Sequence, residues 1–220
     1  MIQANSQPAR SRPSRLLYCG PAAAALFNGL VFIQAITRPG YEFVRHPLSL
    51  LAVGPQGWAQ TANFLLSGLL VVAFAVGVRR TWGGSPATAA GPVLLAFYGF
   101  GMIVAGIFPS DPSDGFPLGA QQPLAMSSQA SLHGMGFLMA QVSLVLACLA
   151  FAYRFVRLRS PGWAFYCLAT AISAPAIAAL GFGYEPTRGL AFFVSAAISL
   201  GWVAALGLKL RAAADRSLQV

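Results

Sequence analysis

Charged residues are scarce in this chain: they make up 9% of its 220 residues and only five are acidic, whereas 57% of the residues are hydrophobic. A soluble domain carries about 25% charged residues. So few charges cannot keep this much apolar surface in water, which excludes a soluble globular domain. Cysteine is scarce as well, and all three cysteines lie within long apolar runs. No disulfide framework is therefore predicted.

The signature motifs of several enzyme classes are also absent. The sequence contains no phosphate-binding glycine loop, no G-x-S-x-G turn, and no HxxxH, HExxH or CxxC pair. These are the patterns typical of nucleotide, serine hydrolase and metal sites. No acidic or basic residue lies near the middle of an apolar run, where a proton-coupled transporter would carry one. Function must therefore be inferred from where the few polar residues lie.

Six long apolar runs dominate what is present. Each has roughly 18–23 residues, close to the ~20 residues that cross a hydrocarbon core at 1.5 Å per residue. They predict an all-α, multi-pass protein of the cell membrane, with six transmembrane helices in one bundle. The runs cover residues 16–37, 59–78, 90–108, 131–153, 163–180 and 190–208.

The basic residues set the expected orientation. All fourteen except Arg38, Arg45 and Arg188 lie in the terminal tails or in the connections that follow the second and fourth runs. Because basic residues stay on the cytoplasmic side in short loops, both termini are predicted to be cytoplasmic. This topology accounts for the net charge of +9, so nucleic acid is not an expected partner.

Three segments follow from this organisation. Residues 1–14, which contain two prolines and several Ser and Arg, are predicted to be a disordered basic tail. Residues 15–210 form the predicted transmembrane domain, and residues 211–220 a cytoplasmic C-terminal tail. In the first outer connection, the apolar segment 47–53 is too short to span a bilayer. We expect a short helix there, with Pro47 in its first turn, at the interface or folded back into the bundle.

Four of the five acidic residues, and both histidines, gather on the side opposite to most of the basic residues. Insertion into a membrane does not require this arrangement, whereas a site that faces one compartment does. These residues lie in, or at the edge of, the three outer connections: Glu42, His46, Asp111, Asp114, His133 and Glu185.

The outer halves of five helices also carry polar side chains. Such groups are costly in hydrocarbon unless they meet a partner or a water-filled cavity. Their common depth predicts a shared polar pocket that opens to the outside; the alternative is a set of separate hydrogen bonds between helices. The side chains are Gln34, Asn63, Ser67, His133, Ser173 and Ser195.

Six residues are the expected contacts for a ligand in such a pocket. Two are amides, and four are charged residues from two G-Y-E-x-x-R segments, at residues 40–45 and 183–188. A Glu and an Arg three residues apart can also pair with each other on one helical turn. The six residues are Gln34, Asn63, Glu42, Arg45, Glu185 and Arg188.

A second reading of the same region is a metal centre. His46, Asp111 and His133 would supply three ligands of an open zinc site, with a fourth position for water or substrate. His133 opens the fourth run, where the helix dipole disfavours the imidazolium, and a neutral imidazole can bind a metal or act as a base. Ser49 adds a hydroxyl group. These four residues are the candidate catalytic set, with zinc as the candidate cofactor.

Short motifs carry a family resemblance. They are the segment 46–51 (HPLSLL) followed by Gly57-Trp58, the segment 106–111 (GIFPSD), and His133-Gly134 at the start of the fourth run. With its six helices, the chain resembles the domain of unknown function 998 (DUF998) family of prokaryotic membrane proteins over about residues 16–210. The activity of that family is not established, so the resemblance implies a fold and positions to test.

Three functions remain open at this point. The first is binding or moving a lipid or small amphiphile at the outward-facing pocket. The second is a metal-dependent, membrane-embedded hydrolase that uses His46, Asp111 and His133. The third is a structural subunit of a larger membrane complex or homo-oligomer, joined through faces of small residues on the helices. Membrane lipids are expected partners in every case.

Overall fold

The computed structural model describes residues 15–82 and 89–218. Within that part of the chain, six helices are long and apolar enough to cross a membrane, which confirms the predicted all-helical class. The tail predicted at residues 1–14 lies outside the described residues. The helices are α1 (Cys19–Thr37), α2 (Trp58–Trp82), α3 (Ala90–Ile107), α4 (Ser128–Arg157), α5 (Pro161–Gly183) and α6 (Arg188–Leu218).

Several helices extend beyond the apolar runs that predicted them. α4 begins at Ser128 because the preceding Ser127 caps it: the Ser127 hydroxyl accepts the backbone N–H of Ala130 at 3.0 Å. His133 therefore lies in the second turn of α4 and not at its first residue. The influence of the dipole falls off within the first turn, so the argument for a neutral His133 from its place at the helix start was wrong. α6 continues to Leu218, into the predicted C-terminal tail.

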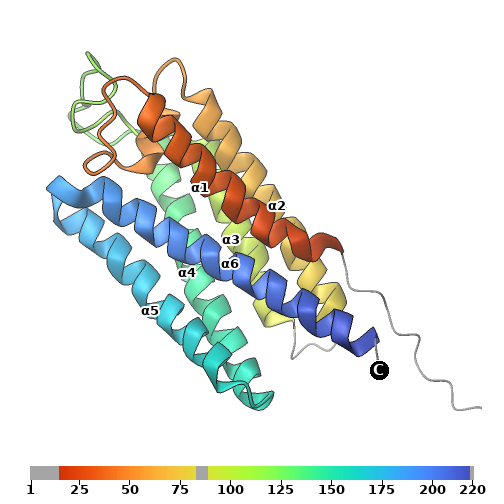
Figure 1. Cartoon of the computed structure of the whole chain (residues 1–220). Helices are drawn as coiled ribbons and strands as arrows, with labels where there is room; N and C mark the ends of the chain where they lie inside the picture. The colour runs from red at the N-terminus through yellow and green to blue at the C-terminus, as the bar shows by residue number, and fades with distance from the viewer. Residues whose placement is uncertain (1–14, 83–88, 219–220) are drawn as a thin grey trace, which may run out of the picture.

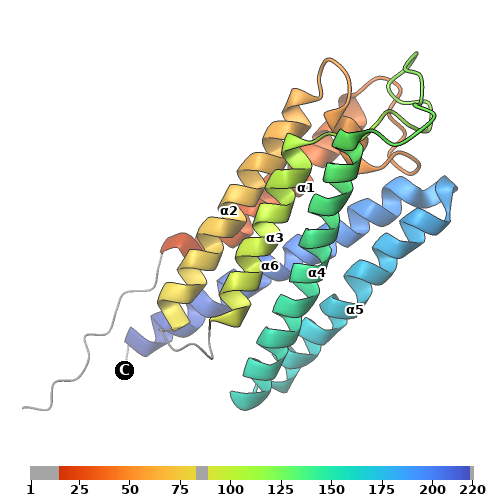
Figure 2. The ribbon, with the colours of Figure 1, turned by 180° about the vertical axis from the view of Figure 1, so that it is seen from behind.

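The six helices form a ring in chain order. Each packs against its neighbours in sequence, and α6 closes the ring against α1 (Figure 1). The connections at residues 38–57 and 108–127 lie together at one end of the bundle, as both views show (Figures 1 and 2). We call this the cap end. The opposite end, where α4 turns into α5, is called the basic end.

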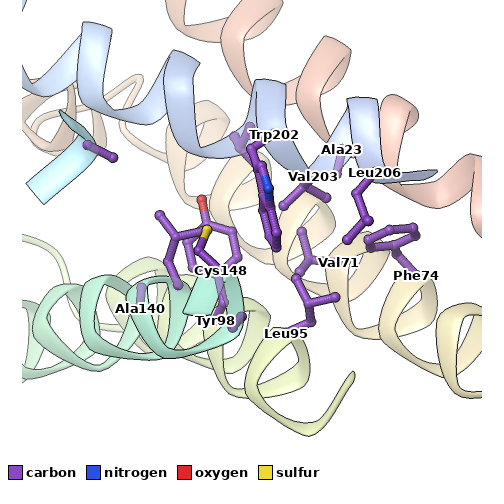
Figure 3. Close-up of a cluster of buried hydrophobic side chains, with 14 of the residues drawn as sticks. Ala23, Val71, Phe74, Leu95, Tyr98, Ala140, Cys148, Trp202, Val203 and Leu206 are labelled. Atoms are coloured by element: carbon purple, nitrogen blue, oxygen red, sulfur yellow. The ribbon is translucent and has the colours of Figure 1, made fainter. Parts of the chain in front are cut away.

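Apolar side chains fill the middle of the ring. Trp202 is fully buried and projects from α6 toward Tyr98 and Cys148 (Figure 3). Its indole N–H donates to the sulfur of Cys167 at 3.4 Å, and its ring meets that of Phe151 edge-on, with centroids 5.6 Å apart. This packing fills the centre of the bundle around Trp202.

Glycines bring α3 and α4 into close contact. A Cβ on Gly101 would lie 2.6 Å from the carbonyl oxygen of Gly136, and a Cβ on Gly136 would lie 2.7 Å from the backbone nitrogen of Ala105. Small residues thus let the two backbones approach, as expected for helices in lipid. Gly201 of α6 differs, because a Cβ there meets nothing within 4 Å.

Adding one methyl group at this contact should destabilise the fold. We expect Gly101→Ala to lower the free energy of unfolding by about 2 kcal/mol, since the α3 and α4 backbones must separate. Thermal unfolding in a mild detergent would measure this. Gly29→Ala in α1 is the matched control, because a Cβ at Gly29 meets nothing within 4 Å. A loss of stability as large in the control would contradict the close-contact account.

Candidate functional site

The connections at residues 38–57 and 108–127 fold over the cap end of the ring, and we call them together the cap. A short 3-10 helix, η2 (Leu48–Ala52), follows Pro47 in the first of them. Leu50 and Leu51 of η2 are buried. The predicted short helix after Pro47 is therefore confirmed, and it is folded back into the bundle.

A two-residue turn shapes the second connection. Asp114 and Gly115 have φ angles of 57° and 83°, the left-handed region that Asp-Gly pairs favour in tight hairpins. Ser113 and Phe116 on either side exchange backbone hydrogen bonds of 3.2 and 2.9 Å. The turn brings Asp114 to the start of α6 and buries Phe116 inside the cap.

His46 joins the two cap segments. Its Nδ1 accepts the backbone N–H of Glu42 at 2.9 Å, and its Nε2 lies 3.1 Å from the carbonyl oxygen of Asp114. A carbonyl oxygen can only accept, so Nε2 carries the proton. The side chain is 2% exposed, and the rings of Tyr41 and Phe116 flank it at 5.5 and 5.4 Å between centroids. Both nitrogens are therefore committed to the backbone of the cap.

Arg38 holds the first cap segment. Its guanidinium donates to the carbonyl oxygens of Leu51 and Val53, at the end of η2. The same group lies 5.4 Å from the ring centroid of Phe116, within the range of a cation–π contact. Burial lowers the pKa of Arg38 from its ordinary value. Arg38 therefore acts within the cap, and it is not among the residues that line the cavity described below.

The start of α6 is tied to both cap segments. Arg188 forms an ion pair of 3.0 Å with Asp114. The backbone N–H of Gly189 donates to the carbonyl of Arg45 at 3.1 Å, which supplies a partner for an unpaired group at the helix start. A Cβ on Gly189 would collide with the carbonyl of His46. Only glycine permits this close approach.

The His133 side chain caps the C-terminal end of α3 with hydrogen bonds to its last carbonyl groups. Its Nδ1 lies 2.8 Å from the carbonyl oxygen of Ala105 and 2.9 Å from that of Phe108. Both oxygens accept, so Nδ1 carries a proton. The N–H of residue 109 would normally bond the Ala105 carbonyl, but Pro109 has none. The imidazole supplies the donor that the proline removes.

Asp111 fixes the start of α4. One oxygen of its carboxylate accepts the backbone N–H of Ser127 at 2.8 Å. A negative charge beside a helix start is favourable, and the bond secures the second cap segment to α4. Asp111 also lines the cavity described next.

A cavity of about 600 Å³ lies beneath the cap, between α3, α4 and α6. Its deeper walls are apolar, with Phe27, Met102 and Leu200 among the lining residues. Polar residues line it as well, and five of them belong to the sequence-predicted sets. These five are Ser49, Asp111, His133, Arg188 and Ser195.

An aromatic cluster borders the cavity between α4, α5 and α6. Phe137, Phe182 and Phe192 meet edge-on in pairs, with centroids 5.0 to 5.9 Å apart, and all three line the cavity. Phe182 is 68% exposed, and Leu124 of the cap, another lining residue, is fully exposed. The cavity therefore reaches the side surface of the bundle near the cap end.

Gln34 and Asn63 lie outside the cavity lining. The amide NH₂ groups of Gln34 and Asn63 donate to the side-chain oxygen of Gln60, at 2.8 and 3.2 Å. The Ser67 hydroxyl donates to the Asn63 side-chain oxygen at 3.3 Å, and Asn63 also donates to the Phe27 carbonyl at 3.1 Å. These residues therefore do not contribute to a shared polar pocket. Their polar groups form hydrogen bonds that join α1 to α2.

The expected metal ligands are not assembled. Within residues 15–82 and 89–218, no three His, Cys, Asp or Glu side chains lie close enough to share a metal ion. His46 has both ring nitrogens bonded to the cap backbone, and only Asp111 and His133 of the set line the cavity. Among the other candidates, Glu42 and Arg45 are exposed on the cap surface.

A family model describing proteins of unknown function, DUF998, matches residues 21–209. The chain belongs to the DUF998 family. Its match covers the cap and the membrane-length part of every helix, so the family resemblance is confirmed. Nothing among curated proteins or solved structures matches the chain.

Some residues of this DUF998 site were not predicted from the sequence. Phe116, which packs inside the cap, is one of them; Asp114 was expected on this side but without its role in the cap, and Asp-Gly at 114–115 was the local signal for the turn that places both. Gln60 accepts hydrogen bonds from both Gln34 and Asn63 and so joins α1 to α2. Its spacing of three residues to Asn63, and of four more to Ser67, places the three side chains on one helix face and could have indicated this network. Gln141 of α4 also lines the cavity, and no motif marks it.

The bond between His133 and the end of α3 can be tested with a proline-dependent rescue. In the DUF998 protein, His133→Leu should lower the free energy of unfolding by about 1–3 kcal/mol, because two buried carbonyls lose their donor. Pro109→Ala restores a backbone N–H for Ala105 and should recover part of this loss. Chemical unfolding of both single variants and of the double variant gives the coupling free energy between His133 and Pro109. Strictly additive effects would refute the pairing.

The role of His46 predicts a stability defect. His46→Ala should lower the free energy of unfolding by about 2 kcal/mol or more, since it leaves buried backbone groups unpaired. It should also speed proteolysis within the cap. Arg45→Ala, at the exposed neighbouring position, should stay within about 0.5 kcal/mol of the wild type. Equal stability of the two variants would show that His46 does not brace the cap.

Proposed function

We propose that this protein binds a lipid or other small amphiphile in the cavity beneath its cap. In this proposal the six helices span the cell membrane, the cap faces outward and both termini are cytoplasmic. The observation that carries the proposal is the cavity of about 600 Å³, which is apolar at depth and polar beneath the cap. Its volume lies in the usual range for small-molecule sites, about 300–1,000 Å³.

The two levels of the cavity suit the two parts of an amphiphile. Near the cap, Asp111, His133 and Arg188 offer a carboxylate, an imidazole nitrogen and a guanidinium. At depth, Met102 and Leu200 offer only apolar surface. Buried polar groups are stable only with hydrogen-bonding partners, whereas a hydrocarbon tail gains by leaving water. A head group beneath the cap and a tail below it meet both demands.

The side opening supports entry from the bilayer. Exposed Phe182 stands at the cavity edge between α5 and its neighbours, and Phe137 and Phe192 pack against it. Aromatic rings present no polar barrier to a hydrocarbon chain that moves between them. A ligand drawn from the membrane can therefore keep its tail in an apolar environment while its head group reaches the cap.

The metal-dependent hydrolase is less well supported by the geometry. It requires His46 beside Asp111 and His133, yet the His46 ring is bonded to the cap backbone and does not line the cavity. A structural subunit would make no use of the cavity. Binding of an amphiphile uses the residues that the cavity brings together, so we give it precedence.

Filling the cavity should expel the ligand. Ala196 of α6 lines the cavity, and Ala196→Phe should reduce the lipid that is retained after purification in mild detergent at least severalfold. Ala179→Phe, on an exposed face of α5, is the matched control and should retain the wild-type amount. Mass spectrometry of extracted lipids measures the difference. Equal retention in the two variants would refute binding in this cavity.

A further inference from the structure

Two buried polar atoms that belong to cavity-lining residues have no hydrogen-bonding partner among the described residues. They are the Ser110 hydroxyl oxygen and the amide nitrogen of Gln141. Two other polar lining groups are paired: Ser195 donates to the Ala174 carbonyl at 2.8 Å, and Ser199 to the Ser195 carbonyl at 2.7 Å. An unpaired buried group is costly. These two atoms therefore mark where the cavity contents must supply a partner.

Gln141 lies deeper in the bundle than the polar groups beneath the cap. It is eight residues after His133 on the same face of α4, with Phe137 midway, and all three residues line the cavity. Eight residues correspond to about 12 Å along a helix. Helical side chains lean toward the N-terminus, which for α4 is the cap end, so the Gln141 amide reaches back toward the head-group level.

The chemistry of this partner is restricted. An amide NH₂ only donates, so the partner must be an acceptor atom and not a cation or a hydrocarbon. A single water would need two to four polar partners, and the side chains of Phe137 and Ala140, which precede Gln141 on α4 and also line the cavity, offer none. The carbonyl that joins an acyl chain to its head group is an acceptor at this level of an amphiphile.

We infer that the cavity selects acyl amphiphiles, in which an ester or amide carbonyl below the head group accepts a hydrogen bond from Gln141. This inference rests on the proposed function and adds the class of ligand. Ser110, in the cap, bonds the head group above. The site thus distinguishes an acylated lipid from an ether-linked lipid of the same length and head group.

A matched pair of lipids tests the inference. Wild-type protein in nanodiscs should bind 1-oleoylglycerol about tenfold more tightly than the corresponding oleyl glycerol ether, which lacks only the carbonyl. Gln141→Leu should bring the two affinities within about twofold by weakening the ester. Gln121→Leu is the control, because Gln121 is exposed and is not among the residues that line the cavity, and it should keep the preference. N-oleoylethanolamine shows whether an amide carbonyl serves equally well.

The outcomes separate this inference from the proposed function. Equal wild-type affinity for ester and ether, or a preference that persists in Gln141→Leu, would overturn the role of Gln141 while leaving amphiphile binding intact. Binding of neither lipid by folded wild-type protein would overturn both. If Gln141→Leu does not fold, Gln141→Met removes the amide donor but keeps a side chain of similar shape. The ratio of the ester affinity to the ether affinity in that variant then decides the role of Gln141.

Discussion

The hydrogen bonds of the His46 ring to two separate backbone segments are the interaction on which the site depends. One nitrogen accepts from Glu42, and the other donates to the carbonyl of Asp114. Asp114 in turn pairs with Arg188 at the start of α6. Because these groups are shielded from water, each must have its partner in place. The cap is therefore held as one unit on the bundle, and its polar residues stay above the apolar cavity.

The requirement that every buried polar group has a hydrogen-bonding partner also distinguishes two kinds of polar group: those that hold the fold together and those that are available to a ligand. His133 supplies the donor that Pro109 cannot, and Gln60 satisfies the amides between α1 and α2. Once these pairs are assigned, the polar atoms that remain without a partner in the cavity are few. Those of Ser110 and Gln141 stand out. The two histidines, the most obvious candidates for chemistry, thus serve mainly to hold backbone segments together, while a less obvious amide faces the ligand.

Much of the fold could be predicted because the apolar runs are local and long. Helix ends were harder to predict. The start of α4 is set by the hydrogen bond that the Ser127 hydroxyl accepts from Ala130, and not by hydrophobicity. The one-sided placement of polar residues pointed to the end of the bundle where Asp111, His133 and Arg188 line the cavity. Position along a helix indicates depth but not the face that a side chain occupies, so Gln34 and Asn63 were expected in the pocket and lie in the α1–α2 network. The contact of His46 with Phe116 joins residues far apart in sequence, and no local pattern predicts it.

The most direct test of the account is an experimental density map of the protein purified from its own membrane into lipid nanodiscs. The account predicts elongated density in the cavity, with a head group near Ser110 and Arg188, a tail beside Met102 and an exit between α4 and α5. A cavity closed by Phe137, Phe182 and Phe192, or occupied only by water along its whole depth, would contradict it.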